Sequence, residues 1–204
     1  MSRLLFLSVL LATAALAAEP LEAPTLSDDE KKLLEKGDVI VRRLEPTGGK
    51  GVAALAVGVV DAAPAEVWPV VRDCQHFKDF MPRTRHSELK QEGGVGLCHV
   101  ELSLPFPMKD LWSDTKSTLR EEPPRYRRTW TLVRGTYRRL DGSWTLLPWG
   151  DGSKTLAVYA IDSAPDSLVP DSLARSAQAK SLPEVVVSVR KRVVSLRGGA
   201  AGSR

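Results

Sequence analysis

The chain has 204 residues, with 29 Lys plus Arg against 25 Asp plus Glu, a formal net charge of +4 and 43% hydrophobic residues. A chain of this length can bury the core of one ordinary domain without support from metals or disulfides. Charged residues make up 26%, and 15 Gly and 14 Pro show no regular period, which excludes a disordered or collagen-like chain. The positive excess is too small for a dedicated nucleic-acid binder, so we expect no nucleic-acid partner.

The first twenty residues have the pattern of a secretory signal peptide. Arg3 gives a short basic start, an apolar run follows as far as Leu16, and Ala15-Leu16-Ala17 fits the A-x-A cleavage pattern. The run is shorter than the ~20 apolar residues that a membrane-spanning helix needs, which makes an uncleaved anchor the less favoured alternative. We therefore expect residues 1–17 to be a signal peptide and the mature protein to be extracytoplasmic, either periplasmic or secreted.

Residues 18–38 are expected to form a linker and a short lead-in helix. The segment Leu26-Ser27-Asp28-Asp29-Glu30 contains the S-x-x-E capping box behind an apolar residue, and Gly37 supplies a C-terminal stop. Two β-rich runs follow, Val39 to Leu44 and Val52 to Val60, separated by a glycine-rich loop that is typical of a hairpin.

Two short helices are predicted after the hairpin. In the first, Pro64 occupies the opening turn, where proline is well tolerated, and Val67, Trp68 and their neighbours form an apolar face. A second short turn holds Phe77 and Phe80 before Pro82 ends it.

The remaining elements are strands that alternate with period two, followed by one long helix. The strands are joined by short turns, which implies antiparallel pairing. Apolar residues at helical spacing then predict the final helix, with a kink or a break at Pro183 and a disordered tail over residues 197–204. The strand candidates run from Arg83 to Lys90, Val95 to Leu104, Leu111 to Leu119, Tyr126 to Val133, Tyr137 to Leu147 and Thr155 to Ile161, and the helix from Val169 to Leu196.

This order of elements predicts an α+β domain over residues 39–196. We expect a curved antiparallel sheet of about seven strands that grips the long C-terminal helix, with two short helices after the first sheet strand. Since one helix cannot fill a wide curved sheet, such an architecture tends to leave a cavity beneath the helix, and a cavity is a candidate ligand site.

The segment from Val60 to Asp73, followed by Phe77-Lys78-Asp79-Phe80-Met81-Pro82, resembles the opening strand and two helices of the START-related helix-grip superfamily, also called SRPBCC. It is similar in particular to the coenzyme Q-binding and polyketide cyclase branch. The resemblance spans about residues 39–192 and implies binding of a hydrophobic molecule, often a lipid or quinone, in a closed cavity and usually without catalysis. Three later segments also resemble this family: Leu104 to Asp110, Asp141 to Pro148, and Val169-Pro170.

Candidate ligand-binding residues either point toward the expected cavity or come from the helices that cover it. Arg128 and Trp130 share one face of their strand, and an inward arginine must find a carboxylate partner or an anionic ligand group. Its alternative is an edge arginine that reaches solvent. For the aromatic candidates the alternative is plain packing, and the direction of Tyr159 is undecided because both faces of its strand are apolar. The candidates are Trp68, Phe80, Arg128, Trp130, Trp144, Tyr159, Leu173 and Ala177.

Cys74 and Cys98 are a candidate disulfide, because an oxidising compartment permits pairing and both positions are expected to face inward. The alternative is two buried free thiols. A zinc site that adds His76 and His99 is not expected, since Cys98 and His99 are strand neighbours that point to opposite faces and no C-x-x-C spacing occurs.

The sequence contains no G-x-S-x-G, H-E-x-x-H or phosphate-binding glycine loop, and its histidines, His76, His86 and His99, are expected at the surface. We therefore predict no catalytic residue, no metal and no cofactor. The expected function is that of an exported, soluble, monomeric protein that binds or transports a lipid or quinone-like molecule. A cyclase-like or hydrolytic enzyme using the same cavity is the alternative, and a scaffold with a collapsed cavity is a third possibility.

Clusters of basic residues suggest one further partner, an anionic membrane surface that the protein contacts transiently while ligand enters or leaves. The alternative is an ordinary solvated face. The clusters are Arg125, Arg127 and Arg128; Arg134, Arg138 and Arg139; and Arg190, Lys191, Arg192 and Arg197.

Overall fold

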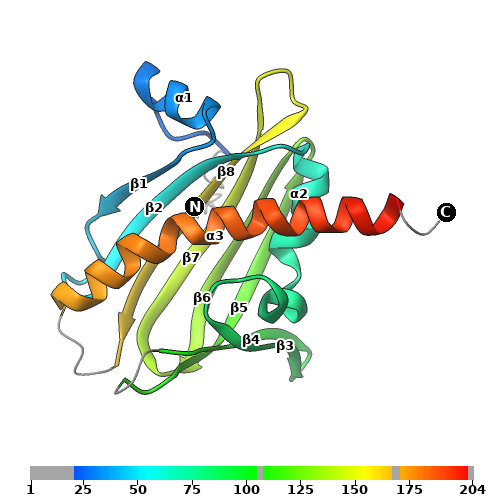
Figure 1. Ribbon diagram of the computed structural model, residues 1–204. Helices are drawn as coiled ribbons and strands as arrows, with labels where there is room; N and C mark the ends of the chain where they lie inside the picture. Colours follow the sequence, from blue (N-terminus) through cyan, green and yellow to red (C-terminus); the bar gives the residue numbers. More distant parts are fainter. Residues whose placement is uncertain (1–20, 105–107, 167–170, 202–204) are drawn as a thin grey trace, which may run out of the picture.

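The computed structural model describes residues 21–104, 108–166 and 171–201, and for 171–180 and 199–201 it describes the backbone alone. One antiparallel sheet of eight strands, in the order β1-β2-β8-β7-β6-β5-β4-β3, curves around helix α3 (Asp171–Ala201), which crosses its concave face (Figure 1). The strands are β1 (Val39–Leu44), β2 (Val52–Val60), β3 (Thr84–Glu92), β4 (Val95–Leu102), β5 (Leu111–Glu122), β6 (Arg125–Gly135), β7 (Tyr137–Trp149) and β8 (Lys154–Pro165).

The predicted α+β helix-grip architecture is confirmed, with eight strands where about seven were expected. The short helices α2 (Pro64–Arg72) and η1 (Cys74–Asp79) follow the second strand rather than the first. The reason is that β1 joins the same sheet as β2, with Val39 opposite Gly58 at one end of the ladder and Leu44 opposite Ala53 at the other.

The lead-in helix, α1 (Asp28–Glu35), begins at the capping box that predicted it. Glu30 N–H donates to the hydroxyl of Ser27, and Ser27 N–H donates to the carboxylate of Glu30, which satisfies two otherwise orphaned donors. Arg42 of β1 also donates to Glu30, and Leu34 is fully buried on the outer face of the sheet. This helix therefore covers part of the convex side and leaves the concave side to α2 and α3.

Helix α3 is one continuous helix, although the sequence predicted a kink or split at Pro183. Its packing explains the difference, because Leu182, Val186 and Val189 on either side of Pro183 are buried in the main core. A Cβ on Gly58 would lie 2.7 Å from Cγ1 of Val186, so the glycine lets the helix approach β2 closely.

The predicted disordered tail over residues 197–204 is wrong for its first five residues, which continue α3 as far as Ala201. Arg197 explains the extension, because its guanidinium donates to the carboxylate of Glu66 and to the carbonyl of Asp61. These bonds fasten the last turns of α3 to the start of α2. Residues 202–204 lie outside the part of the chain that the structure describes.

The main hydrophobic core lies between the concave face, α2 and α3, and a second cluster lies on the opposite face of the sheet beneath α1. Both faces of β2 and β8 are consequently buried. Within the described ranges, no helix is both long enough and apolar enough to cross a membrane. The expected signal peptide lies outside the described residues.

Candidate functional site

One row of side chains crosses the concave face beneath α3. Arg128 of β6 stands opposite Trp144 of β7, Trp144 stands opposite Tyr159 of β8, and Tyr159 stands opposite Ala56 of β2. The Tyr159 ring lies 4.8 Å from Trp144 and 5.8 Å from Trp130, measured between ring centroids. The undecided direction of Tyr159 is thus resolved toward the concave face, where four of the predicted ligand-binding residues come together.

Trp130 lies over β7 because its cross-strand partner is Gly142. A Cβ at that position would come within 2.3 Å of Cζ2 of the Trp130 indole, a separation that real Cβ atoms do not adopt. The glycine therefore makes room for the indole to lie against the sheet and to reach Tyr159. Unlike Trp144, which is 1% exposed, Trp130 and Tyr159 keep part of their surface accessible.

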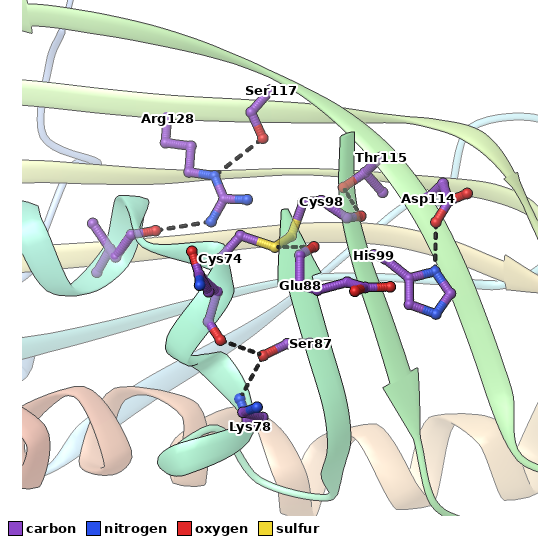
Figure 2. The surroundings of a disulfide bond; sticks show 12 residues. Cys74, Lys78, Ser87, Glu88, Cys98, His99, Asp114, Thr115, Ser117 and Arg128 are labelled. Atoms are coloured by element: carbon purple, nitrogen blue, oxygen red, sulfur yellow. Dashed lines mark hydrogen bonds and ion pairs between the residues drawn. A yellow bond between two sulfur atoms is a disulfide. The ribbon is translucent and has the colours of Figure 1, made fainter. Parts of the chain in front are cut away.

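Arg128 is 4% exposed and its guanidinium makes two hydrogen bonds, both to neutral groups. Nε donates to Oγ of Ser117 at 3.1 Å and Nη1 donates to the carbonyl of Val71 at 2.8 Å (Figure 2). The guanidinium carbon also lies 5.0 Å from the ring centroid of Phe77 and 5.5 Å from that of Trp130. These contacts place the group between two aromatic rings, where cation–π attraction stabilises it.

Burial lowers the pKa of Arg128 to about 10, so the side chain remains a cation at neutral pH. No carboxylate in the described ranges lies within 4 Å of it. The structure therefore excludes two interpretations of Arg128: it is not an edge arginine that reaches solvent, and it is not part of an exposed basic cluster with Arg125 and Arg127. Residues of alternating parity on β6 point to opposite faces, and the even positions face the core.

Two tyrosines of the sheet, Tyr159 in the row with Arg128 and Tyr137 at the start of β7, are neutral. Burial raises the pKa of Tyr159 to about 12, against a smaller opposite effect of the Arg128 charge, and burial also raises the pKa of Tyr137. Both hydroxyl groups therefore stay protonated at neutral pH and can donate hydrogen bonds. They provide no negative charge to compensate the arginine.

Helix α2 brings its own side chains to this row. Its first turn is fixed by Glu66, whose carboxylate accepts from Ala63 N–H, and by Thr155, whose hydroxyl donates to the carbonyl of Ala62. One face of the helix then carries Trp68, stacked on Tyr126 at 5.3 Å between ring centroids. The buried Nε1 of Trp68 has no hydrogen-bond partner in the structure as described.

The structure says less about the three remaining predicted ligand-binding residues. Phe80 is partly buried at the end of η1, with its ring 6.0 Å from that of Phe77 and 5.7 Å from the guanidinium of Arg192. Leu173 and Ala177 belong to α3, but their side chains lie outside the described residues. They remain predictions.

The two groups that accept hydrogen bonds from Arg128 were not among the predicted site residues. The parity of β5 could have indicated Ser117, which stands opposite Trp130. No sequence signal could have indicated the Val71 carbonyl, because a main-chain group carries no residue identity and the contact joins positions 57 residues apart.

Cys74 and Cys98 form a disulfide, with their Cα atoms 5.8 Å apart. Of the two alternatives left open by the sequence, the structure has the bridge. It joins η1 to β4 (Figure 2). Since η1 also carries Phe77, the bridge holds the ring that lies over the guanidinium of Arg128.

His99 was expected at the surface, and this prediction is wrong. Its side chain does point away from Cys98, to the convex face, but it is 8% exposed because Asp114 stands opposite it on β5. Its Nδ1 lies 2.5 Å from one oxygen of Asp114, whose other oxygen accepts from Arg134. Although burial opposes the shift, these two partners hold the pKa of Asp114 below its ordinary value.

No group of three or more histidine, cysteine or carboxylate side chains within the described ranges is arranged to hold a metal. A groove of about 270 Å³ lies elsewhere, where α1, the end of β2 and the C-terminal half of α3 meet. Leu34, Val59, Val193 and Arg190 contribute to its walls. None of the predicted ligand-binding residues lines this groove.

A curved antiparallel sheet closed by a long C-terminal helix, with an aromatic concave face beneath it, defines a START-related helix-grip protein. Residues 60–190 match the model of the family described as polyketide cyclase / dehydrase and lipid transport. This match covers more than half of the sequence, so the chain belongs to that family.

Three solved structures illustrate the relationship. A STAR-related lipid transfer protein fragment from Xanthomonas axonopodis is 18% identical, with a TM-score of 0.66 over 76% of this chain and 93% of that one. Human StAR-related lipid transfer protein 5 is 15% identical, with a TM-score of 0.63 over 78% and 84% of the two chains.

The third is the Zhui aromatase/cyclase from Streptomyces sp. R1128, which is 15% identical with a TM-score of 0.52 over 76% of this chain and 93% of that one. At these identities the likeness shows the fold alone. No curated protein matches the chain.

Proposed function

We propose that this protein binds a hydrophobic small molecule, such as a lipid or a quinone-like molecule, between the concave face of the sheet and α3, and that it acts as a binding or transport protein. The observation that carries the proposal is the row of aromatic side chains around a buried Arg128. Trp130 and Tyr159 keep accessible surface on the face that α3 covers. An apolar ligand that removes such surface from water gains about 25 cal/mol per Å².

The chemistry of the face supports binding more than catalysis. The polar side chains described around Arg128 include Ser117 and the protonated Tyr159. The one buried histidine, His99, points to the opposite face. The alternative of a cyclase-like or hydrolytic enzyme therefore lacks a side chain here that would exchange a proton near neutral pH.

Native mass spectrometry of protein purified gently from its own host tests this proposal. We expect a bound mass that survives desolvation, disappears on denaturation and is extracted into organic solvent. Apo protein that also takes up no fatty acid, phospholipid or quinone analogue would contradict it. Conversion of an added ligand into a new mass, lost on substituting Tyr159 by Phe, would indicate the enzyme instead.

We further propose that the protein is exported and acts as a monomer. The signal-peptide pattern of residues 1–17 motivates export. Edman sequencing of protein from the periplasm or the medium should begin near residue 18. Full-length protein that starts at Met1 and stays in the cytoplasm would contradict export, and a dimer mass in light scattering would contradict the monomer.

We also propose transient contact with an anionic membrane surface, but through fewer basic residues than the sequence predicted. Arg134, Arg139 and Arg197 are held in ion pairs with carboxylates, and Arg128 is buried. Pelleting with anionic liposomes at low and high salt tests the contact. The proposal fails if no protein pellets at low ionic strength.

A further inference from the structure

We propose that the ligand is an anionic amphiphile, whose carboxylate or phosphate pairs with Arg128 while its apolar chain lies along the concave face. This inference rests on the proposed function and narrows it, because it makes neutral sterols, alcohols and quinones poor ligands. It starts from a side chain that is cationic, buried and without a counter-ion among the described residues.

The described groups in direct contact with Arg128 carry no charge. Its hydrogen-bond acceptors are a hydroxyl, on Ser117, and a main-chain carbonyl, on Val71, and its two other close contacts are aromatic rings. Buried charges in proteins are normally paired with an opposite charge, since an isolated one is strongly disfavoured outside water. No described side chain in contact with Arg128 supplies the opposite charge, so we assign that role to the ligand.

The carboxylate of Asp73 acts on Arg128 electrostatically, but it is a poor counter-ion. Its side chain is 44% exposed and lies 2.6 Å from Nδ1 of His76. Solvent screens a charge in this position, and its hydrogen-bonding capacity is partly used. The aromatic rings of Phe77 and Trp130 attract the guanidinium but do not neutralise it.

The donors of Arg128 also suit an oxyanion. A guanidinium has five N–H donors, and two of them are used, one by Ser117 and one by Val71. Three remain, and a carboxylate or phosphate accepts two in the paired geometry that arginine favours. The buried Nε1 of Trp68, on the helix that supplies Val71, is another donor without an acceptor in the described structure.

A neutral acceptor would satisfy these donors less completely. A quinone carbonyl or a sterol hydroxyl can accept a hydrogen bond, but it leaves the positive charge of Arg128 uncompensated in an apolar setting. An anion satisfies the donors and the charge together. The row of Trp130, Trp144 and Tyr159 then provides apolar contact for the chain attached to that anion.

Titration calorimetry at pH 8 with three probes that share one 18-carbon chain tests the inference: oleic acid, 1-oleoyl-glycerol 3-phosphate and oleyl alcohol. Each acid is used below its critical micelle concentration and the alcohol below its solubility limit. We expect one or both acids to bind wild-type protein at least 10-fold more tightly than the alcohol. The two acid arms distinguish a carboxylate from a phosphate headgroup.

The variant Arg128→Met should weaken binding of the preferred acid by roughly 10- to 100-fold and leave the alcohol within about 3-fold. Arg138→Met removes the same charge from an exposed position of β7 and should change neither affinity. If Arg128→Met does not fold, the wild-type comparison of acid with alcohol still decides the question.

Failure of the inference differs from failure of the proposed function. Equal binding of acid and alcohol to wild type, or an acid preference that survives in folded Arg128→Met, overturns the anionic ligand and leaves hydrophobic binding intact. No binding of any probe, together with no lipid in the host-purified protein, overturns both.

Discussion

The guanidinium of Arg128 donates a 2.8 Å hydrogen bond to the main-chain carbonyl of Val71, so the buried cation of β6 is joined directly to helix α2. The bond links the concave face to one of the helices that cover it. The same guanidinium lies under the Phe77 ring of η1, which the Cys74–Cys98 bridge ties to β4. Sheet, α2 and η1 therefore converge on one charged group.

Gly142→Ala should reduce both stability and ligand uptake. The added methyl group would meet the Trp130 indole at 2.3 Å and the carbonyl of Ala160 at 2.7 Å, so the indole must move off β7 into the space proposed for the ligand. Overpacking of this kind costs about 1–3 kcal/mol of unfolding free energy, which urea denaturation measures.

Gly96→Ala is the matched control. Its methyl group would make only ordinary contacts of 3.6 Å with Gln91 and Leu89, and its backbone does not need a positive φ. Unfolding free energy within about 0.5 kcal/mol of wild type and unchanged lipid uptake are expected. Equal behaviour of the two glycine variants would contradict the position assigned to Trp130.

Loss of the disulfide should destabilise the protein without removing the fold. The bridge spans a sequence separation of 24, for which restriction of the unfolded chain predicts roughly 3 kcal/mol. Denaturation of wild type with and without reductant measures this difference. The double variant Cys74→Ala/Cys98→Ala is the control: it should be as stable as the reduced protein and show no response to reductant. A thiol titration of unreduced, unfolded wild-type protein that finds two free thiols would contradict the bridge.

Asp114→Asn should reveal a pH-dependent contribution to stability. Burial opposes the ionised form of Asp114, but its bonds to His99 and Arg134 prevail and lower the pKa in the folded protein. The ionised carboxylate therefore favours the folded state. Its contribution is complete above about pH 4, the pKa of the unfolded chain, and is lost as pH falls through the lower folded pKa.

The difference in unfolding free energy between wild type and Asp114→Asn should thus be about 1–3 kcal/mol near pH 6 and should shrink below pH 4. Glu92→Gln serves as control, since Glu92 pairs with the same Arg134 but is half exposed, so solvent screens this ion pair and the variant should change stability far less than Asp114→Asn does. A difference that grows toward low pH would contradict the assigned direction of the Asp114 shift.

Alternation with period two was sufficient to predict much of the concave face. It placed Arg128 and Trp130 on one side of β6 and turned Cys98 inward, because a strand with one polar face has only one register that buries its apolar side. It could not orient Tyr159. Both faces of β8 are buried, one against α3 and the other against Leu34 and the second core cluster, so both read as apolar.

Contacts between segments far apart in the chain set a second limit on what could be predicted from the sequence. His99 is buried because Asp114 stands opposite it, a pairing that depends on the register between β4 and β5. The end of α3 depends likewise on the bond from Arg197 to Glu66, across 131 residues. Local propensity at Gly198 and Gly199 predicts a stop, and this tertiary contact overrides it.

The location of the ligand is the central claim, and a crystal structure with a terminally brominated fatty acid tests it most directly, because anomalous scattering locates the bromine independently of any fitted chain. We predict the carboxylate at Arg128 and the bromine farther along the concave face beneath α3, one chain length away from the carboxylate. Bromine in the groove beside Leu34 and Val193, or on the convex face near His99, would contradict the claim.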